Sequence, residues 1–237
     1  MSKRLPIKAI TFDLDDTLWS IWPIIDRAER LLHIWLTEHY PRIPKSYTPL
    51  KLRELCSIIA HDRPDIAHDH TALRKASLRL AATYTGYTTF DVEQAFAIFF
   101  SARNNVELFT DVRPTLEHLA QHYTLASLTN GNADIKQIGL DDVFTFSLNA
   151  IDVGAAKPAA PMFEAACQRL AMCPEQIVHV GDDPVFDIQG AAEAGFRTVW
   201  INRHNQSWPE TTSQADAMIH SLDELDVVLA TWNTDNR

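Results

Sequence analysis

Hydrophobic and polar positions alternate differently in two parts of this chain. Short, nearly continuous apolar runs occur near the start and through the second half: Lys8–Phe12, Tyr123–Leu128, Phe144–Ala150, Ile177–Val180 and Arg197–Ile201. Such runs, separated by helical segments such as Ile188–Ala194, are typical of parallel strands covered on both faces. The pattern therefore predicts an α/β fold with a doubly wound, mostly parallel, Rossmann-like sheet.

From about Ile21 to Val106 the apolar positions follow a helical period instead. Three sets each fall on one face of a helix: Ile24, Ala28, Leu31, Leu32 and Trp35; Leu73, Ala76, Leu80 and Ala81; Val92, Ala95, Phe96 and Phe99. Of seven glycines only Gly86 precedes residue 131, and helical hairpins need few glycines. We therefore expect residues 21–106 to form an inserted helical domain, with residues 1–20 and 107–237 forming the α/β core.

Composition and charge narrow the class of partner. The chain has 237 residues, 46% hydrophobic, and its 21 basic against 31 acidic residues give a formal charge of −10. This charge disfavours nucleic acid and anionic membranes as partners, and the sequence makes no prediction of oligomeric state. Three cysteines without a C-x-x-C pair suggest neither a disulfide framework nor a zinc site. Neither a signal peptide nor an apolar run of about 20 residues is visible, so the cytoplasm is the expected location.

An acidic cluster directly follows the first predicted strand. Asp13 and Asp15 stand two residues apart, so both carboxylates can point into one site if the chain stays extended. One can attack phosphorus as a nucleophile, and the other can transfer a proton to the leaving oxygen. Carboxylates this close require a divalent cation, and hard oxygen ligands favour magnesium. On its own, the D-x-D-x-T pattern fits an acidic turn equally well.

Two clusters that could bind a phosphoryl group follow other predicted strands. Thr129 precedes Asn130 and Gly131, and its hydroxyl beside loop N–H groups could hold phosphoryl oxygens. Lys157 precedes Pro158 and could balance the charges of an aspartate nucleophile and a phosphate. Taken singly, both clusters are commonly plain turns.

The last cluster, Gly181–Asp187, follows the fourth predicted strand. Asp182 comes directly after the strand and is well placed as a metal ligand. Asp187 could orient that ligand without binding the metal itself, or it could simply cap the following helix. Both interpretations of Asp187 remain open at this point.

Together these motifs resemble the haloacid dehalogenase-like hydrolase superfamily. The resemblance lies in Phe12-Asp-Leu-Asp-Asp-Thr-Leu18, Leu128-Thr-Asn-Gly131, Gly154-Ala-Ala-Lys-Pro158 and Val180-Gly-Asp-Asp183 with Asp187. It implies a phosphatase that uses Mg²⁺. In the catalytic roles the resemblance implies, Asp13 is the nucleophile, Asp15 the general acid and base, and Thr129 and Lys157 bind the phosphoryl group. It assigns the metal to Asp13, the Asp15 backbone carbonyl and Asp182, and it implies that the helical insertion is a cap that selects substrates.

The resemblance also ranks the possible reactions. Dehalogenase members of the superfamily lack the second aspartate of the first motif, so Asp15 favours hydrolysis of a small-molecule phosphate ester. Asp183 departs from the serine that many relatives carry. The segments Leu128–Ala133 and His179–Pro184 resemble a bacterial branch that dephosphorylates the riboflavin precursor phosphoribitylamino-uracil and can act on FMN. The alternatives are a phosphomutase or phosphotransferase, a dehalogenase, and a non-catalytic binding module.

Some conspicuous residues have simpler interpretations. His61-Asp62 and His68-Asp69-His70 lack the spacing of a zinc-binding helix and are expected to be ordinary solvated residues. Trp19 and Trp22 flank the entry into the helical segment and could stack on an aromatic substrate. Packing in the core or at the hinge is the favoured interpretation for both.

Overall fold

The computed structural model describes residues 5–209 and 214–234, and its internal contacts divide the chain into two units. The α/β unit comprises residues 1–20, 107–131 and 139–237, and the helical unit comprises 21–106 and 132–138. The sequence-based ranges differ from this division in one segment, because they place residues 132–138 in the α/β core. Asn132 explains the difference: its amide donates to Thr71 Oγ1 (3.1 Å), and its carbonyl oxygen accepts from Arg103 Nε (3.2 Å).

Within the described residues the α/β unit contains six strands that pair in parallel in the order β3-β2-β1-β4-β5-β6. The strands are β1 (Ala9–Phe12), β2 (Thr124–Thr129), β3 (Phe146–Asn149), β4 (Ile177–Gly181), β5 (Arg197–Ile201) and β6 (Ala217–Ile219). Every residue of β1, β4 and β5 is buried, which explains their continuous apolar sequence. The predicted doubly wound parallel sheet is confirmed, and β6 is an addition to it.

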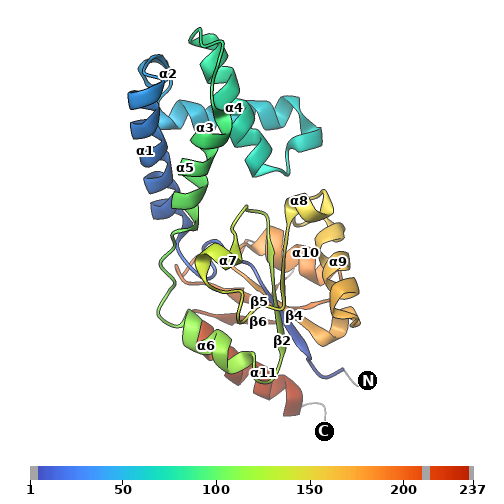
Figure 1. The fold of residues 1–237 in the computed structure, drawn as a ribbon. Helices are drawn as coiled ribbons and strands as arrows, with labels where there is room; N and C mark the ends of the chain where they lie inside the picture. Colours follow the sequence, from blue (N-terminus) through green and yellow to red (C-terminus); the bar gives the residue numbers. More distant parts are fainter. Residues whose placement is uncertain (1–4, 210–213, 235–237) are drawn as a thin grey trace. The chain divides into compact units, whose positions relative to one another are not determined.

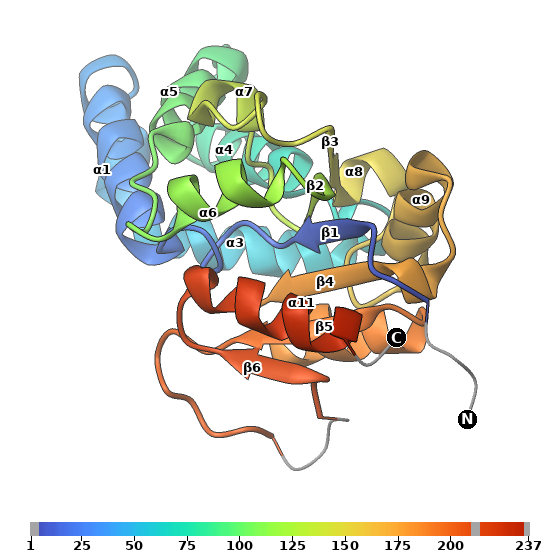
Figure 2. The same ribbon diagram turned by 90° about the horizontal axis from the view of Figure 1, so that it is seen from below.

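Helices cover both faces of this sheet, as Figures 1 and 2 show. They are α6 (Val112–Leu119), α8 (Ala150–Val153), α9 (Ala160–Leu170), α10 (Gly190–Glu193) and α11 (Leu225–Thr234). Helices α9 and α10 pack together on one face, and α6 and α11 lie on the other. This division follows from right-handed crossovers, because the chain moves in one direction across the sheet from β1 to β3 and in the other from β4 to β6.

The helical unit is built from α1 (Ile21–His39), α2 (Arg42–Ser46), α3 (Pro49–Asp62), α4 (His70–Tyr84), α5 (Val92–Asn104) and α7 (Ile135–Ile138), with a 3₁₀ turn at Pro64–Ile66. Three of these helices begin at a side-chain cap. Thr48, Asp69 and Asp91 each accept a hydrogen bond from a backbone N–H in the first turn of the helix that follows. Such caps satisfy amides that would otherwise lack a partner, and they fix where each helix starts.

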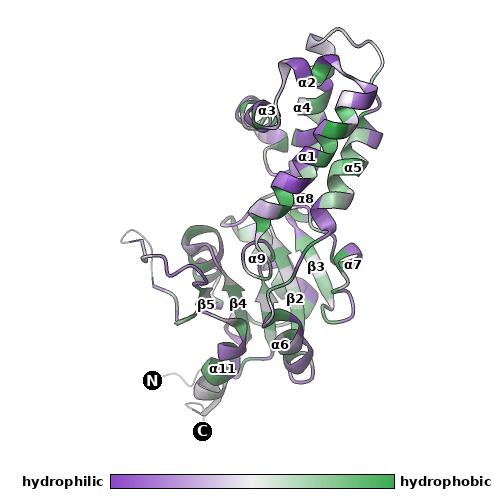
Figure 3. Ribbon diagram, turned by 90° about the vertical axis from the view of Figure 1, so that its left-hand side faces the viewer, coloured by the Kyte–Doolittle hydropathy of each residue, from purple (hydrophilic) through white to green (hydrophobic). Residues whose placement is uncertain are grey.

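The core of the helical unit agrees with the predicted faces for α5 and only in part for α1 and α4. All four predicted α5 positions are buried. In α1, Leu31 is instead 43% exposed, and Figure 3 shows hydrophobic and hydrophilic residues along the length of this helix. In α4, Ser77 and Leu78 are buried where Ala76 and Leu80 were expected, because α4 packs against both α3 and α5. No helix in residues 5–209 and 214–234 is long and apolar enough to cross a membrane.

Candidate active site

The chemically active clusters meet where the strand order of the sheet changes direction. Strands β1 and β4 are neighbours, with Phe12 opposite Val180, and the chain leaves them toward opposite edges of the sheet. Asp13 follows β1 and Asp182 follows β4. Ligands of open α/β sheets bind at such a switch point, beyond the carboxyl ends of the strands. The fold therefore brings the first and last motifs side by side.

The loop after β1 is closed by its own hydrogen bonds. The Asp13 amide donates to the Val180 carbonyl (2.9 Å), and the chain then turns at Asp16, whose φ is 58°. Aspartate tolerates this left-handed conformation better than most residues. The turn lets the Asp16 amide donate to the Trp19 carbonyl (2.7 Å) and Trp19 Nε1 donate to Asp15 Oδ1 (2.9 Å). The two aspartates are thus presented by a loop of fixed shape.

Lys157 links the motifs at the centre of the site. Its side chain is almost fully buried, and its Nζ donates to Asp13 Oδ1 (2.7 Å), Asp187 Oδ1 (2.6 Å) and the Leu128 carbonyl (2.6 Å). The loop that carries it is held by Asn130, which accepts from the Lys157 amide (2.6 Å) and donates to the Lys157 carbonyl (3.0 Å). The lysine is therefore fixed at both its backbone and its ammonium group.

Asp187 is a buried partner of Lys157 and does not cap a helix. Its Oδ2 accepts from the Asp183 amide (3.0 Å), and its Oδ1 lies 3.3 Å from His179 Nε2. His179 is itself fully buried in β4, with Nδ1 2.9 Å from Thr11 Oγ1. The capping role belongs to Asp183, which accepts from the amides of Val185 and Phe186 at the start of a π-helical turn, Pro184–Gln189. Of the two interpretations of Asp187, the helix-cap interpretation is wrong.

Asp182 is held from both its side chain and its backbone. Thr17 Oγ1 donates to Asp182 Oδ1 (3.0 Å), and Trp200 Nε1 donates to the Asp182 carbonyl (2.8 Å). Burial raises the pKa of Asp182 to about 7, and the negative charge of Asp187 adds to this effect. Half of these carboxyls would therefore be protonated near neutral pH unless a cation stabilised the ionised form.

Charge in the site is only partly balanced. Burial raises the pKa of Asp13 well above its usual range, and Lys157 offsets this only in part. Burial also opposes ionisation of Asp187, yet Lys157 and the hydrogen bond from His179 hold the pKa of Asp187 well below its usual range. Lys157 itself has a raised pKa, because the two aspartates outweigh the effect of its burial. Asp187 is thus the established partner of the lysine, while Asp13 and Asp182 favour a further positive charge.

The donor set fits a divalent cation. Carboxylate oxygens of Asp13, Asp182 and Asp187 lie within 4.8 Å of one another. Both oxygens of Asp187 already accept hydrogen bonds from Lys157, His179 or the Asp183 amide. Asp13 and Asp182, whose ionised forms burial disfavours, are therefore the better suited ligands, and oxygen donors of this kind suit Mg²⁺.

A cavity of about 180 Å³ brings together every residue that the sequence analysis placed in the site. Its lining is Asp13, Asp15, Thr129, Asn130, Gly131, Lys157, Asp182, Asp183, Phe186 and Asp187. Thr129 contributes a hydroxyl that accepts from the Gly131 amide (3.0 Å). Sequence reasoning did not assign the hydrogen bonds made by Thr17, Trp19, His179 and Trp200. Of these four residues only Thr17 had a sequence signal, because it is the threonine of the D-x-D-x-T pattern.

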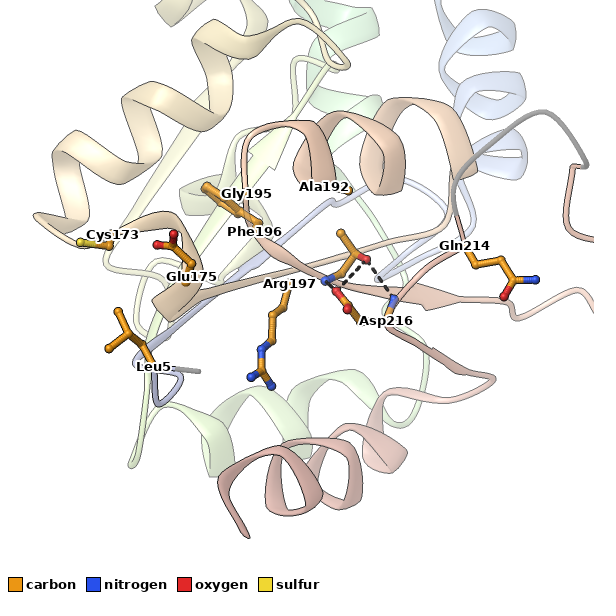
Figure 4. Close-up of a pocket in the computed structure, with 10 residues that line it drawn as sticks. Leu5, Cys173, Glu175, Ala192, Gly195, Phe196, Arg197, Gln214 and Asp216 are labelled. Atoms are coloured by element: carbon orange, nitrogen blue, oxygen red, sulfur yellow. Dashed lines mark hydrogen bonds between the residues drawn. The ribbon is translucent and has the colours of Figure 1, made fainter. Parts of the chain in front are cut away.

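A second pocket of about 860 Å³ lies at the opposite end of β5 (Figure 4). Arg197, the first residue of β5, lines it together with Glu175 and Asp216, and the Asp216 carboxylate accepts hydrogen bonds from the amide and the hydroxyl of Thr198. This pocket contains none of the four motifs, and it opens at the amino end of the strand, where open α/β sheets rarely bind substrates. The smaller cavity is therefore the candidate active site.

The parallel sheet and the acidic motifs at the carboxyl ends of its strands are those of an α/β hydrolase, and the comparison with known sequences agrees. The chain belongs to the haloacid dehalogenase-like hydrolases, whose family profile matches residues 7–195.

Some of the similar proteins are named as phosphatases and others as dehalogenases. The 5-amino-6-(5-phospho-D-ribitylamino)uracil phosphatase YigB of Escherichia coli is 33% identical over 210 residues, which are 85% of this chain and 88% of that protein. The glyceraldehyde 3-phosphate phosphatase of Methanopyrus kandleri is 29% identical and covers 94% of this chain and 97% of its own length. A crystal structure of a 2-haloacid dehalogenase from Pseudomonas syringae superimposes with a TM-score of 0.88 at 40% identity, covering 95% of this chain and 99% of that one.

Proposed function

We propose that this hydrolase cleaves small-molecule phosphate monoesters through an aspartyl-phosphate formed on Asp13. The observation that carries the proposal is the position of Asp15, which lines the same cavity as Asp13 and Lys157. A departing alkoxide needs a proton, and a second carboxyl beside the nucleophile can supply it. Displacement of halide from carbon does not need this proton, so the presence of Asp15 favours phosphate esters.

In the proposed reaction each residue has one task. Lys157 and Thr129 bind the phosphoryl oxygens, and a carboxylate oxygen of Asp13 attacks phosphorus as the bond to the ester oxygen breaks. Asp15 gives its proton to the departing ester oxygen. It then takes a proton from the water whose oxygen attacks phosphorus, which breaks the acyl-phosphate bond and restores Asp13.

Magnesium would be held by Asp13, Asp182 and the Asp15 backbone carbonyl, with Asp187 fixing the lysine beside them. When bound, the ion would neutralise the acidic cluster and the charge of the phosphoryl group. The raised pKa values of Asp13 and Asp182 support this assignment, because a nearby cation is what their ionised forms lack.

The substrate we propose is a phosphoribitylamino-pyrimidine or a related flavin phosphate, acted on in the cytoplasm. The support is the name of the Escherichia coli relative, which matches most of this chain. Residues 21–106 would then serve as the cap that excludes water and selects the substrate.

Phosphate release from a panel of esters tests the proposal. The panel holds FMN, phosphoribitylamino-uracil, nucleotides and sugar phosphates, each assayed with Mg²⁺ and with EDTA. We expect metal-dependent release that Asp13→Asn abolishes without unfolding the protein. Phosphate transfer to a sugar-phosphate acceptor in place of release would identify a phosphotransferase, and no turnover of any ester by folded wild-type protein would reject the proposal.

Dehalogenation is the second candidate, because the structure from Pseudomonas syringae bears that name at 40% identity. It is tested in parallel by halide release from 2-chloropropionate. We expect none above background, and Asp15→Asn should leave that result unchanged. Halide release faster than phosphate release would reverse the order of the two candidates.

A further inference from the structure

Trp19 both packs in the core and donates a side-chain hydrogen bond to the proposed general acid. Its indole Nε1 donates to Asp15 Oδ1 at 2.9 Å, and its side chain is fully buried. We propose that Trp19 is a positioning residue that orients Asp15 for proton transfer. This inference rests on the proposed phosphatase activity and assigns a residue to it.

The local backbone makes this contact rigid. Asp15 and Trp19 also form an isolated bridge between their main chains, and the Trp19 carbonyl accepts from the Asp16 amide (2.7 Å). The intervening turn is closed by a bond from the Leu18 amide to the Leu14 carbonyl (2.8 Å). Because both backbone and side chain of Trp19 contact the same short segment, the Asp15 carboxyl cannot rotate without losing a partly buried hydrogen bond.

The direction of this hydrogen bond has a chemical consequence. An indole N–H only donates, so Asp15 Oδ1 must act as the acceptor. In the neutral carboxyl the proton then belongs on Oδ2. Trp19 therefore selects which oxygen of Asp15 delivers the proton to the leaving group and later receives one from water. A freely rotating carboxyl would place its proton correctly for only part of the time.

A purely structural role for Trp19 makes a different prediction. A buried indole needs a hydrogen-bond partner, and Asp15 could serve only that need. Loss of the indole would then lower stability and slow every substrate by the same factor. A positioning role would instead slow each substrate according to how strongly its leaving oxygen needs to be protonated.

The experiment compares two esters in wild type and Trp19→Phe. An alkyl phosphate such as FMN has a strongly basic leaving oxygen, whereas p-nitrophenyl phosphate leaves readily without a proton. We expect Trp19→Phe to lower kcat/KM for FMN, which reports the step in which the leaving group departs, by about tenfold or more, and to change kcat/KM for p-nitrophenyl phosphate less than about threefold. Trp232→Phe, which alters a half-buried tryptophan of α11 beside Arg197, is the matched control and should leave the ratio of the two rate constants unchanged.

A double-mutant cycle completes the test. In an Asp15→Asn background, Trp19→Phe should cause no further loss for FMN, because the group on which it acts is gone. If Trp19→Phe does not fold, replacement of Trp19 with 3-(3-benzothienyl)alanine keeps the shape and removes the N–H. Equal losses of kcat/KM for both esters, or losses that multiply with Asp15→Asn, would overturn the inference while wild-type turnover still upholds the phosphatase. If wild type does not hydrolyse FMN, the alkyl phosphate of the panel that it does hydrolyse takes its place, and a wild type inactive on every ester of the panel would overturn the proposed function instead.

Discussion

Replacing Asp182 with asparagine removes a partly buried negative charge and keeps the shape of the side chain. The pKa of Asp182 is about 7 in the folded chain and 3.8 for an ordinary aspartate, a difference worth about 4 kcal/mol. Since this folded-state pKa is raised, ionisation destabilises the metal-free protein progressively as the pH rises from about 4 through 7. Asparagine still accepts the Thr17 hydrogen bond, so Asp182→Asn should stabilise the metal-free protein by about 2–4 kcal/mol at pH 8 and hardly at all at pH 4.

Urea denaturation in EDTA, followed by tryptophan fluorescence at both pH values, measures this difference. Asp183→Asn is the matched control, because it removes the same charge one residue away and can still cap the π-helical turn. Added Mg²⁺ should stabilise wild type more at pH 8 than at pH 5, and this gain should be largely absent in Asp182→Asn. An Asp182→Asn protein no more stable than wild type at pH 8, or equally stabilised at both pH values, would refute the reasoning.

Three further predictions concern the surrounding contacts. Lys157→Met leaves Asp13 and Asp187 buried without their partner and should lower the free energy of unfolding by about 3–5 kcal/mol at pH 7 in urea titrations. Burial lowers the pKa of His179, so this histidine alone should lower the free energy of unfolding as the pH falls below about 6.5, where the unfolded histidine takes up a proton. Asp182 acts in the opposite direction over the same range, so the effect is measured as a difference: below about pH 6.5 His179→Gln should lose less stability, or gain more, than wild type, and identical slopes would contradict the assignment. Asp111 accepts from Arg203 and the Leu222 amide, and despite partial burial these bonds lower its pKa. Asp111→Asn should therefore cost about 1 kcal/mol at pH 7 and progressively less as the pH falls below the ordinary aspartate pKa and through the lowered folded-state value, as measured by urea denaturation.

The sheet could be predicted from sequence wherever its strands are buried on both faces. Such strands read as unbroken apolar runs, as β1, β4 and β5 do. The two further strands that the sequence indicated, β2 and β3, are also present, although in β3 only Leu148 is buried. Strand β6 escaped prediction because it has three residues, of which Met218 is 52% exposed. Its three apolar residues, Ala217–Ile219, are too few to indicate a strand. The faces of α1 and α4 were harder to predict, because the neighbours of a helix decide which part of an apolar stripe is covered.

The cluster of site residues followed from simple topology, since carboxyl ends of parallel strands meet at one edge. What the sequence did not contain was the set of bonds among them. The contact between Trp19 and Asp15 depends on the left-handed turn at Asp16, and that between His179 and Asp187 depends on the helical turn after β4. The prediction for Trp22 was wrong: it was expected to pack in the core or at the hinge, yet it is 61% exposed and lies beside Arg53.

The segment 132–138 determines whether the helical unit can be transplanted between relatives of this protein. A helical unit made only of residues 21–106 would be a single insertion, joined to the rest at two points and replaceable as one cassette. Here the chain passes between the units four times, and the amide of Asp134 donates to Asn104 Oδ1 (2.8 Å). Chimaeras that transplant 21–106 alone would separate Asn132 from Thr71 and Arg103. Recombination between relatives should therefore succeed more often when both segments come from the same parent.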